Sequence, residues 1–341
     1  MLGASEDIRR TMNRWKSSLN CTFLILIIQL FGDAAFGQMP ALSPLPQTGT
    51  LSAPAHPKQF TFVLAGDNRP AHNSCPQPPT PGKIFSAVKQ MNPSAAFVLW
   101  TGDTISGKEP EPKRIQAEYQ EFLGIAKTAG VPVFNAPGNH ELDDGNNAPS
   151  GTMKKLYRKY MAGTYGAFSY GNSRFIALDS ENKPFGKSKS LAKKGEAPGA
   201  ITQKQLTLLQ QDLDANKDKT HVVIFMHHPA QPYDAEDGLD DASVKALEKM
   251  FKNYSNVSYV ISGHEHMYYN SQGDRSKYVA PPSRTDPAQP PFYLVSGGGG
   301  APLKNNTPGS FFHYIVFNVD GNKISPTLVK VDSSDPCDKG N

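Results

Sequence analysis

The chain has 341 residues, of which 38% are hydrophobic, and its formal net charge is +4. This length accommodates one large α/β domain or two smaller domains. Acidic and basic residues are mixed along the chain without a basic stripe, so the sequence carries no nucleic-acid-binding signature. It does not indicate an oligomeric state.

Residues 1–37 predict a signal peptide. Four basic side chains precede the apolar run at 22–31, and the small residues Ala35 and Gly37 fit a cleavage site before Gln38. We therefore expect a secreted or periplasmic protein, cleaved near Gly37–Gln38, that has no attachment to a membrane after cleavage.

Two alternatives at the N-terminus stay open. The apolar run is short for a bilayer span, yet it could remain as an uncleaved anchor. The acidic stretch before the basic residues is unusual for a signal peptide, and Met12 would be a more conventional start of translation than Met1.

The rest of the chain divides into three parts. Residues 38–58 are rich in Pro, Ser and Ala and predict a flexible linker. Apolar runs of strand length begin at residue 60, so we place one domain at 59–333 and a C-terminal tail at 334–341.

Signal cleavage would remove Cys21 and leave Cys75 and Cys337. An even pair of cysteines in an exported chain suggests one disulfide, which would tie the tail to the loop after the first strand. The alternative is that both residues remain as thiols.

Short apolar runs, rich in β-branched and aromatic residues and bounded by turn residues, predict strands buried on both faces. They lie at 60–65, 96–100, 131–135, 222–226, 257–261 and 292–295. Apolar residues at helical spacing predict helices between them, at 83–91, 113–128, 202–214 and 241–251. Thr202 is the expected N-cap of the third helix, with Gln205 three residues on.

Two further stretches, 166–180 and 311–332, predict hairpins, each around a turn that contains glycine. Alternating strands and helices indicate a layered α/β fold, and the hairpins make its sheets mixed rather than purely parallel. We therefore predict a four-layer α/β/β/α sandwich of two mixed sheets with flanking helices.

Polar residues follow five of the apolar runs. The blocks are GDNR at 66–69, GD at 102–103, GNHE at 138–141, HHP at 227–229 and GHEH at 263–266. In α/β sheets, ligands gather at the carboxyl ends of strands. Oxygen and imidazole donors together suit first-row metal ions such as Zn, Fe or Mn.

In this order and spacing, the five blocks resemble the calcineurin-like metallophosphoesterase superfamily over about residues 60–300. The resemblance implies the calcineurin-like phosphoesterase fold. It also implies hydrolysis of phosphoesters at a dinuclear centre of two divalent or trivalent metal ions, such as Fe, Zn or Mn.

Carried over residue by residue, the resemblance implies a set of metal ligands. They are Asp67, Asp103, Asn139, His227, His264 and His266. Asp103 would bridge both ions, Asp67 and His266 would bind the first, and the remaining three would bind the second. His227 is preferred to His228 because the family's ligand precedes proline by two positions.

The resemblance implies His140 and Asp103 as catalytic residues. His140 would protonate the leaving group or stabilise the transition state, and the Asp103 bridge would hold the ions roughly 3.5–4 Å apart. A metal-bound hydroxide would then attack phosphorus directly. Arg69, Asn139 and His140 are the candidates for binding the substrate phosphate.

One position departs from the family pattern. The first block usually reads Asp-x-His with the histidine as a ligand, but this chain has Arg69 there, and a guanidinium cannot ligate a metal. Purple acid phosphatases, a branch that also lacks this histidine, use a tyrosine where this chain has Ser106. His72, Asn68 or water could fill the gap, and Arg69 could instead bind a phosphate in bidentate fashion. We expect the first ion's site to be the weaker one.

The sequence therefore predicts an exported, metal-dependent phosphoester hydrolase, either a phosphatase or a phosphodiesterase, that acts on a small-molecule or other phosphoester. Arg69 favours phosphomonoesters, because a doubly charged phosphate gains from an extra cation. The alternative is a non-catalytic metal- or phosphate-binding protein on the same fold with a degenerate first metal site.

Overall fold

The computed structural model describes residues 50–107, 111–144, 151–161, 163–182, 199–286, 289–334 and 337. All of them belong to the compact unit Met39–Asn341. The predicted signal peptide (1–37), the start of the predicted linker (38–49) and most of the predicted tail lie outside the described residues. Within the described part, no helix is both long enough and apolar enough to cross a membrane.

The first sheet has five strands in the order β11-β10-β1-β2-β3. Their bounds are Gln59–Ala65 (β1), Val98–Trp100 (β2), Val133–Asn135 (β3), His313–Asp320 (β10) and Lys323–Lys330 (β11). β1, β2 and β3 run parallel, with Val63 opposite Val98 and Val98 opposite Val133, whereas β10 is antiparallel to both of its neighbours. The three parallel strands therefore end at the same edge of the sheet.

The second sheet has six strands in the order β4-β5-β6-β7-β9-β8. Their bounds are Gly166–Tyr170 (β4), Ser173–Ala177 (β5), His221–Phe225 (β6), Val257–Ser262 (β7), Tyr268–Asn270 (β8) and Phe292–Ser296 (β9). The four inner strands are parallel, and the edge strands β4 and β8 are antiparallel to their neighbours. Both sheets are thus mixed, as the two predicted hairpins require.

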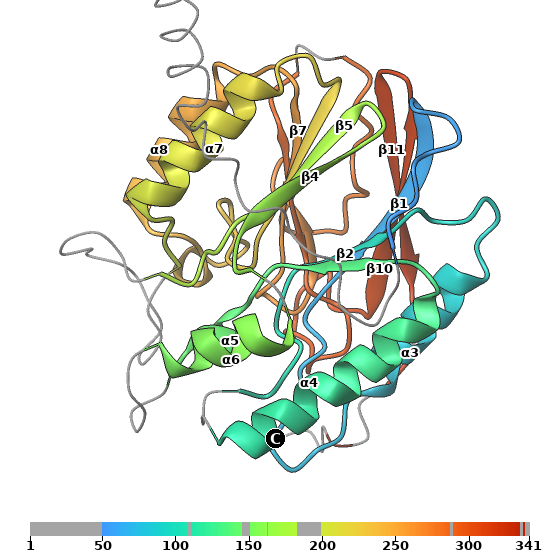
Figure 1. Ribbon diagram of the computed structural model, residues 1–341, viewed down its shortest axis with the longest axis vertical. Helices are drawn as coiled ribbons and strands as arrows, with labels where there is room; N and C mark the ends of the chain where they lie inside the picture. Colours follow the sequence, from blue (N-terminus) through green and yellow to red (C-terminus); the bar gives the residue numbers. More distant parts are fainter. Residues whose placement is uncertain are drawn as a thin grey trace, which may run out of the picture. The chain divides into compact units, whose positions relative to one another are not determined.

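Helices cover the outer faces of both sheets (Figure 1). Their bounds are Pro79–Lys89 (α3), Pro112–Ala126 (α4), Asn139–Leu142 (α5), Thr152–Tyr160 (α6), Gln203–Ala215 (α7) and Asp241–Phe251 (α8), with 3₁₀ turns at Lys127–Ala129 and Ala235–Asp237. The buried residues of α3, α4 and α6 share a core with the first sheet, and those of α7 and α8 share one with the second.

Aromatic side chains fill the space between the two sheets. Phe62 of β1 stacks on Phe317 of β10 (4.8 Å between ring centroids) and meets Phe175 of β5 edge-on (5.1 Å). Each fully buried ring of this kind contributes about 1.5–3 kcal/mol. The sheets therefore pack face to face, and the predicted α/β/β/α sandwich is confirmed.

Each of the six predicted strands and four predicted helices is present, and so are both hairpins. Thr202 caps α7 as predicted, because its side chain accepts a hydrogen bond from the Gln205 N–H (3.2 Å). Three elements, α5, α6 and β8, were not predicted from the sequence. The end of the predicted linker contacts the folded domain, because the carbonyls of Pro57 and Lys58 accept hydrogen bonds from the turns of the two hairpins.

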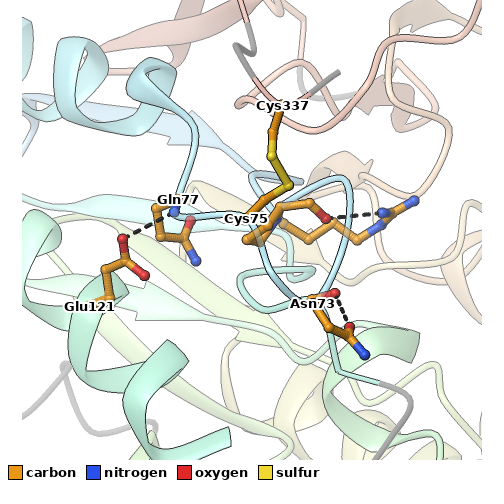
Figure 2. The surroundings of a disulfide bond; sticks show 8 residues. Asn73, Cys75, Gln77, Glu121 and Cys337 are labelled. Atoms are coloured by element: carbon orange, nitrogen blue, oxygen red, sulfur yellow. Dashed lines mark hydrogen bonds between the residues drawn. A yellow bond between two sulfur atoms is a disulfide. The ribbon is translucent and has the colours of Figure 1, made fainter. Parts of the chain in front are cut away.

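The predicted disulfide between Cys75 and Cys337 is present, with the Cα atoms 6.1 Å apart (Figure 2). It ties the C-terminal segment to the loop between β1 and α3. In the same loop, the Gln77 N–H donates to Glu121 of α4 (3.0 Å) and Asn73 accepts a hydrogen bond from the Ser106 hydroxyl (Figure 2). The loop that begins at the end of β1 is therefore held at several points.

Replacing both cysteines by serine is expected to lower the free energy of unfolding by about 2–4 kcal/mol, because the cross-link restricts the unfolded chain. Urea unfolding of the variant and of the oxidised protein would measure the difference. A peptide map under non-reducing conditions should give one cross-linked peptide with both residues, whereas two alkylatable thiols would contradict the pairing.

Candidate metal centre

Two carboxylates lie at the carboxyl ends of neighbouring parallel strands. Asp67 follows β1, Asp103 follows β2, and both side chains are buried. Backbone hydrogen bonds join the two loops, from the Asp67 N–H to the Gly102 carbonyl (2.9 Å) and from the Asn68 N–H to the Asp103 carbonyl (3.0 Å). The two carboxylates are therefore brought together at one edge of the first sheet, as the topology predicts.

Three of the predicted ligands have an unusual backbone conformation. Asp67, Asp103 and His264 have φ angles of 63°, 52° and 71°, and among the described non-glycine residues only Asn306 also has a positive φ. This left-handed conformation is uncommon for residues with a side chain and costs free energy that the surroundings must offset. Such residues concentrate at functional sites, which supports a functional role for this edge of the sheets.

Gly263 lets the second sheet reach the carboxylates of the first. It follows β7 directly, and a Cβ on it would overlap the Asp67 carboxylate. The next residue, His264, donates its backbone N–H to Asp67 Oδ1 (2.7 Å). Glycine is needed because the backbone approaches the carboxylate so closely. The GHEH block thus joins the two sheets at the site.

The second ligand group consists of Asp103, Asn139, His227 and His264. The Nε2 atom of His227 lies 3.0 Å from Asn139 Oδ1, 3.1 Å from His264 Nδ1 and 3.3 Å from Asp103 Oδ1. On its other side, His227 Nδ1 lies 2.8 Å from the Thr101 carbonyl, which can only accept, so Nδ1 carries the proton. Nε2 therefore presents a lone pair to two acceptor oxygens.

The first ligand group consists of Asp67, Asp103 and His266, whose ligand atoms all lie within 4.8 Å of one another. His266 Nε2 is 3.8 Å from Asp67 Oδ1. His266 Nδ1 lies 2.8 Å from the Pro302 carbonyl and so donates to it. A hydrogen bond from the second ring nitrogen to a carbonyl is how metal-binding histidines are usually oriented.

The charges of the site also fit a cation. Burial lowers the pKa of His227 to about 4 and lowers the pKa values of His264 and His266 well below their usual range, so these rings present neutral nitrogens. Burial, followed by the charge of Asp103, raises the pKa of Asp67. A buried carboxyl whose pKa is raised by its surroundings favours a nearby cation, because the cation stabilises its deprotonated form, and neutral imidazole nitrogens can bind the same cation. The residues present therefore fit two metal ions.

Glu141 holds the two loops that carry Asp103 and Asn139. Its carboxylate accepts hydrogen bonds from the backbone N–H groups of Asp103 (2.9 Å) and Gly138 (2.6 Å), and from both donors of Thr104. Burial, followed by the charge of Asp103, raises the pKa of Glu141 to about 7. This residue supports the site and does not face it as a ligand.

His140 lies beside the second ligand group on α5. Its backbone N–H donates to Asp103 Oδ1 (3.2 Å), and its Nδ1 contacts the Ser106 carbonyl. Its Nε2 points to the other side of the ring and lies 3.9 Å from Asp103 Oδ2. Since the carbonyl only accepts, Nδ1 keeps its proton and Nε2 is the atom that can exchange one with a substrate.

Arg69 occupies the side of the first ligand group where the family pattern has a histidine. Its Nε lies 3.6 Å from Asp103 Oδ2, and this buried nitrogen donates no hydrogen bond to any described residue. The guanidinium is therefore inside the site with donor capacity left over. Its positive charge also partly offsets the two neighbouring carboxylates, which weakens the need for a metal ion beside them.

Two side chains near the position of the missing histidine, those of Asn68 and Ser106, already form hydrogen bonds with other residues. Asn68 accepts a hydrogen bond from the Trp100 indole (2.9 Å) and donates one to Gln77 (2.5 Å). Ser106 donates its hydroxyl to Asn73, and His72 is exposed to solvent. Of the substitutes named from the sequence, this leaves water and the exposed His72.

His228 lies outside both ligand groups. Its Nδ1 pairs with Glu181 Oε1 (2.7 Å), and its ring packs against that of His264. Glu181 has no signal in the sequence, since it lies in a segment without a recognisable block. The same holds for the Thr101 and Pro302 carbonyls, because any residue can supply a backbone carbonyl.

A second cluster of acidic residues lies beside the GHEH block but already holds a cation. Asp234, Asp237 and Glu265 surround the Lys304 ammonium at 2.6, 2.8 and 3.2 Å. These hydrogen bonds and charges raise the pKa of Lys304, although burial opposes them. This cluster is an ion-pair network that braces the block, not a metal site.

Comparison with known proteins identifies the family. The calcineurin-like phosphoesterase model matches residues 60–268, and the chain belongs to this family, as the five blocks predicted. A curated relative, the 3′,5′-cyclic adenosine monophosphate phosphodiesterase CpdA of Haemophilus influenzae, is 24% identical over 209 residues. The match covers 59% of this chain and 65% of the relative, so the chain spans less than two thirds of that protein's length.

Two solved structures share the fold. A dimetal phosphatase from Danio rerio has a TM-score of 0.55 at 16% identity, and the match covers 81% of this chain and 99% of that one. The purple acid phosphatase PPD1 of yellow lupin (Lupinus luteus) has a TM-score of 0.58 at 18% identity, with 83% and 54% covered. At this level of identity, the likeness establishes the architecture of the two mixed sheets and their flanking helices.

Proposed function

We propose that the protein is an exported metal-dependent phosphoester hydrolase with a dinuclear metal centre. The observation that carries the proposal is the second ligand group, where the lone pair of His227 Nε2 meets oxygen atoms of Asn139 and Asp103 at 3.0 and 3.3 Å. Membership of the calcineurin-like phosphoesterase family and the name of its phosphodiesterase relative support the activity.

In this proposal, the two ligand groups hold one ion each, and Asp103 belongs to both. The first group would bind its ion through Asp67, Asp103 and His266, and the second through Asp103, Asn139, His227 and His264. When bound, the ions would supply a nucleophilic hydroxide at neutral pH and neutralise charge on the phosphoryl oxygens. Oxygen and imidazole donors allow Fe, Zn or Mn, and they do not distinguish among these.

The remaining site residues act on the substrate. Arg69 directs its unused donors to a phosphate oxygen, Asn139 and His140 contact the phosphate, and His140 Nε2 donates a proton to the leaving oxygen. The Ser106 carbonyl assists because it fixes the proton on Nδ1 and so sets which nitrogen faces the substrate. An extra cation beside the phosphate favours the dianionic group of a phosphomonoester over the singly charged group of a diester.

Export is part of the proposal. The disulfide between Cys75 and Cys337 supports it, because disulfides persist in oxidising compartments such as the periplasm and the extracellular space. The N-terminal basic and apolar segments of the sequence give the second argument.

The test combines metal content with turnover. Elemental analysis of the purified protein should give two transition-metal ions per chain, and p-nitrophenyl phosphate should be hydrolysed faster than bis-p-nitrophenyl phosphate. Faster turnover of the diester would support the proposed hydrolase activity but contradict the preference for monoesters. Protein that holds two ions and hydrolyses neither ester would overturn the hydrolase.

Arg69→Ala is expected to raise the KM for p-nitrophenyl phosphate by about tenfold or more, because a hydrogen bond to a charged group contributes about 1.5–3 kcal/mol. Arg69→Lys should recover part of the loss, since it keeps the positive charge but not the paired N–H donors of the guanidinium. Arg275→Ala is the matched control, because Arg275 is an exposed arginine that pairs with Asp234 outside the ligand groups. An unchanged KM in Arg69→Ala would remove Arg69 from substrate binding.

Arg69 also favours a second candidate function, a non-catalytic metal- or phosphate-binding protein. If its charge prevents binding at the first ligand group, one ion remains and the two-ion chemistry is lost. One ion per chain, phosphate binding by calorimetry and no turnover would establish this alternative.

A further inference from the structure

Two of the three ligand histidines are oriented by backbone carbonyls, and His264 is not. His227 and His266 each direct Nδ1 to a carbonyl oxygen, of Thr101 and Pro302 respectively. The His264 ring forms no hydrogen bond with a carbonyl or carboxylate of the described residues. A histidine ring has a broad, roughly two-fold torsion about χ2, so some other contact must determine which nitrogen faces the metal site.

Apart from His227, whose Nε2 lies 3.1 Å from His264 Nδ1, the ring that packs against His264 is that of His228. The His228 and His264 rings have centroids 4.1 Å apart and planes inclined by 33°. His228 also meets the His227 ring edge-on, with centroids 5.4 Å apart and planes at 89°. His228 therefore lies against two ligand histidines at once while its own Nδ1 points away from the ligand groups.

His228 is itself held firmly. Its Nδ1 pairs with Glu181 Oε1 at 2.7 Å, and the two side chains are only 5% and 6% exposed. Its backbone N–H donates to the Ser180 hydroxyl (3.0 Å), and that hydroxyl in turn donates to Glu181 (2.8 Å). The Gly199 backbone packs on the ring, since a Cβ there would lie 2.6 Å from His228 Cγ. The ring has little freedom to move.

We infer that Glu181 and His228 form a positioning pair that fixes the His264 ring so that its Nδ1 faces the second ligand group, where it would bind a metal ion. The inference rests on the proposed role of His264 as a ligand. In this arrangement, stacking replaces the hydrogen bond that orients the other two histidines, and Glu181 fixes the rotation of the stacking ring. Neither residue belongs to a ligand group.

The test is Co²⁺ binding to the full chain. Calorimetry measures the affinity, and the visible absorption bands of Co²⁺ report on its ligands. Substituting an outer partner of a metal ligand typically costs 10–100-fold in metal affinity. His228→Ala should therefore weaken one of two Co²⁺ sites by about that factor and alter its absorption bands, because His264 loses its fixed orientation. Unchanged affinity and bands would overturn the positioning role.

Two further variants separate stacking from a general loss of structure. Glu181→Gln/His228→Phe keeps an aromatic face without leaving an unpaired buried carboxylate, and it should retain part of the affinity, because the stacking ring remains but Glu181 no longer fixes its rotation. His228→Gln keeps a hydrogen-bonding group without the ring and should lose it. The opposite order would overturn the inference even if His228→Ala failed to fold.

His221→Ala is the control, because His221 is a buried histidine at the far end of β6 that bonds Ser258 and the Gly321 carbonyl. It should lower thermal stability and leave both Co²⁺ sites unchanged. Wild-type protein that binds no Co²⁺ would overturn the ligand assignment itself. Wild-type and His228→Ala proteins that bind two ions equally would overturn only the positioning pair.

Discussion

Asp103→Asn is expected to abolish metal-dependent hydrolysis while the metal-free protein remains as stable as the wild type or becomes more stable. The substitution keeps the shape of the side chain and the oxygen that accepts the His140 N–H. It removes one charge from a group of buried carboxylates that includes Asp67 and Glu141. The pKa values of both are raised by burial and, next, by the charge of Asp103, so repulsion in the metal-free site should fall.

The same substitution removes the one carboxylate that belongs to both ligand groups. Both ions should therefore bind weakly, and kcat should fall by about 10³-fold or more, which corresponds to about 4 kcal/mol of transition-state stabilisation. The substitution should therefore lower activity while it leaves the stability of the metal-free protein unchanged or raises it. Such opposite effects are typical of functional sites that hold like charges close together.

Thermal unfolding with and without added metal measures both effects. Wild-type protein should be stabilised by metal, by about 2.7 kcal/mol at 100 times the Kd, and Asp103→Asn should show almost none of this. Asp212→Asn is the control, because Asp212 is a buried aspartate paired with Arg174 (2.9 Å) on the outer side of the second sheet. It should destabilise the protein and leave the metal response intact. A fully active Asp103→Asn enzyme would refute the bridge.

The location of the site at one edge of the sheets could be predicted from the sequence, and the reason is physical. Short apolar strands buried on both faces can be recognised from composition, and parallel strands bring their carboxyl ends to one edge. Residues that follow such strands, including Asp67, Asp103 and His264, are therefore predictable as neighbours even though they are up to 197 positions apart.

The supporting contacts could not be predicted in this way. Glu181 meets His228 through a loop whose path depends on tertiary packing, and the Thr101 carbonyl orients His227 with a backbone atom that every residue has. Lys304 lies far along the chain from the acidic residues that it neutralises. No local pattern records any of these contacts.

Of the elements that were missed, one did carry a signal. In α6, Met153 and Tyr157 are buried and lie four positions apart, a spacing typical of a helix, although the basic residues between them obscure the pattern. β8 has three residues, which is too short for any periodicity to be detected, and it forms because it pairs with β9.

His140→Ala is expected to lower kcat by about 10²–10⁴-fold, the usual contribution of a positioned general acid, while both metal ions stay bound. The reason is that the two functions of this residue use different atoms. Its backbone N–H supports Asp103 and survives the substitution, whereas Nε2, the atom that would face the substrate in the proposed mechanism, is removed together with the contact to Ser106.

Elemental analysis and steady-state kinetics on the same sample separate the two functions. The loss should depend on the leaving group: an ester of p-nitrophenol, whose oxygen leaves readily without a proton, should lose less than an alkyl ester that needs one. His72→Ala is the control, because His72 is an exposed histidine in the loop after β1, and it should keep both metal and activity. Loss of a metal ion in His140→Ala would make His140 a ligand instead of an acid, and equal losses for both esters would assign it to charge stabilisation, not to proton transfer.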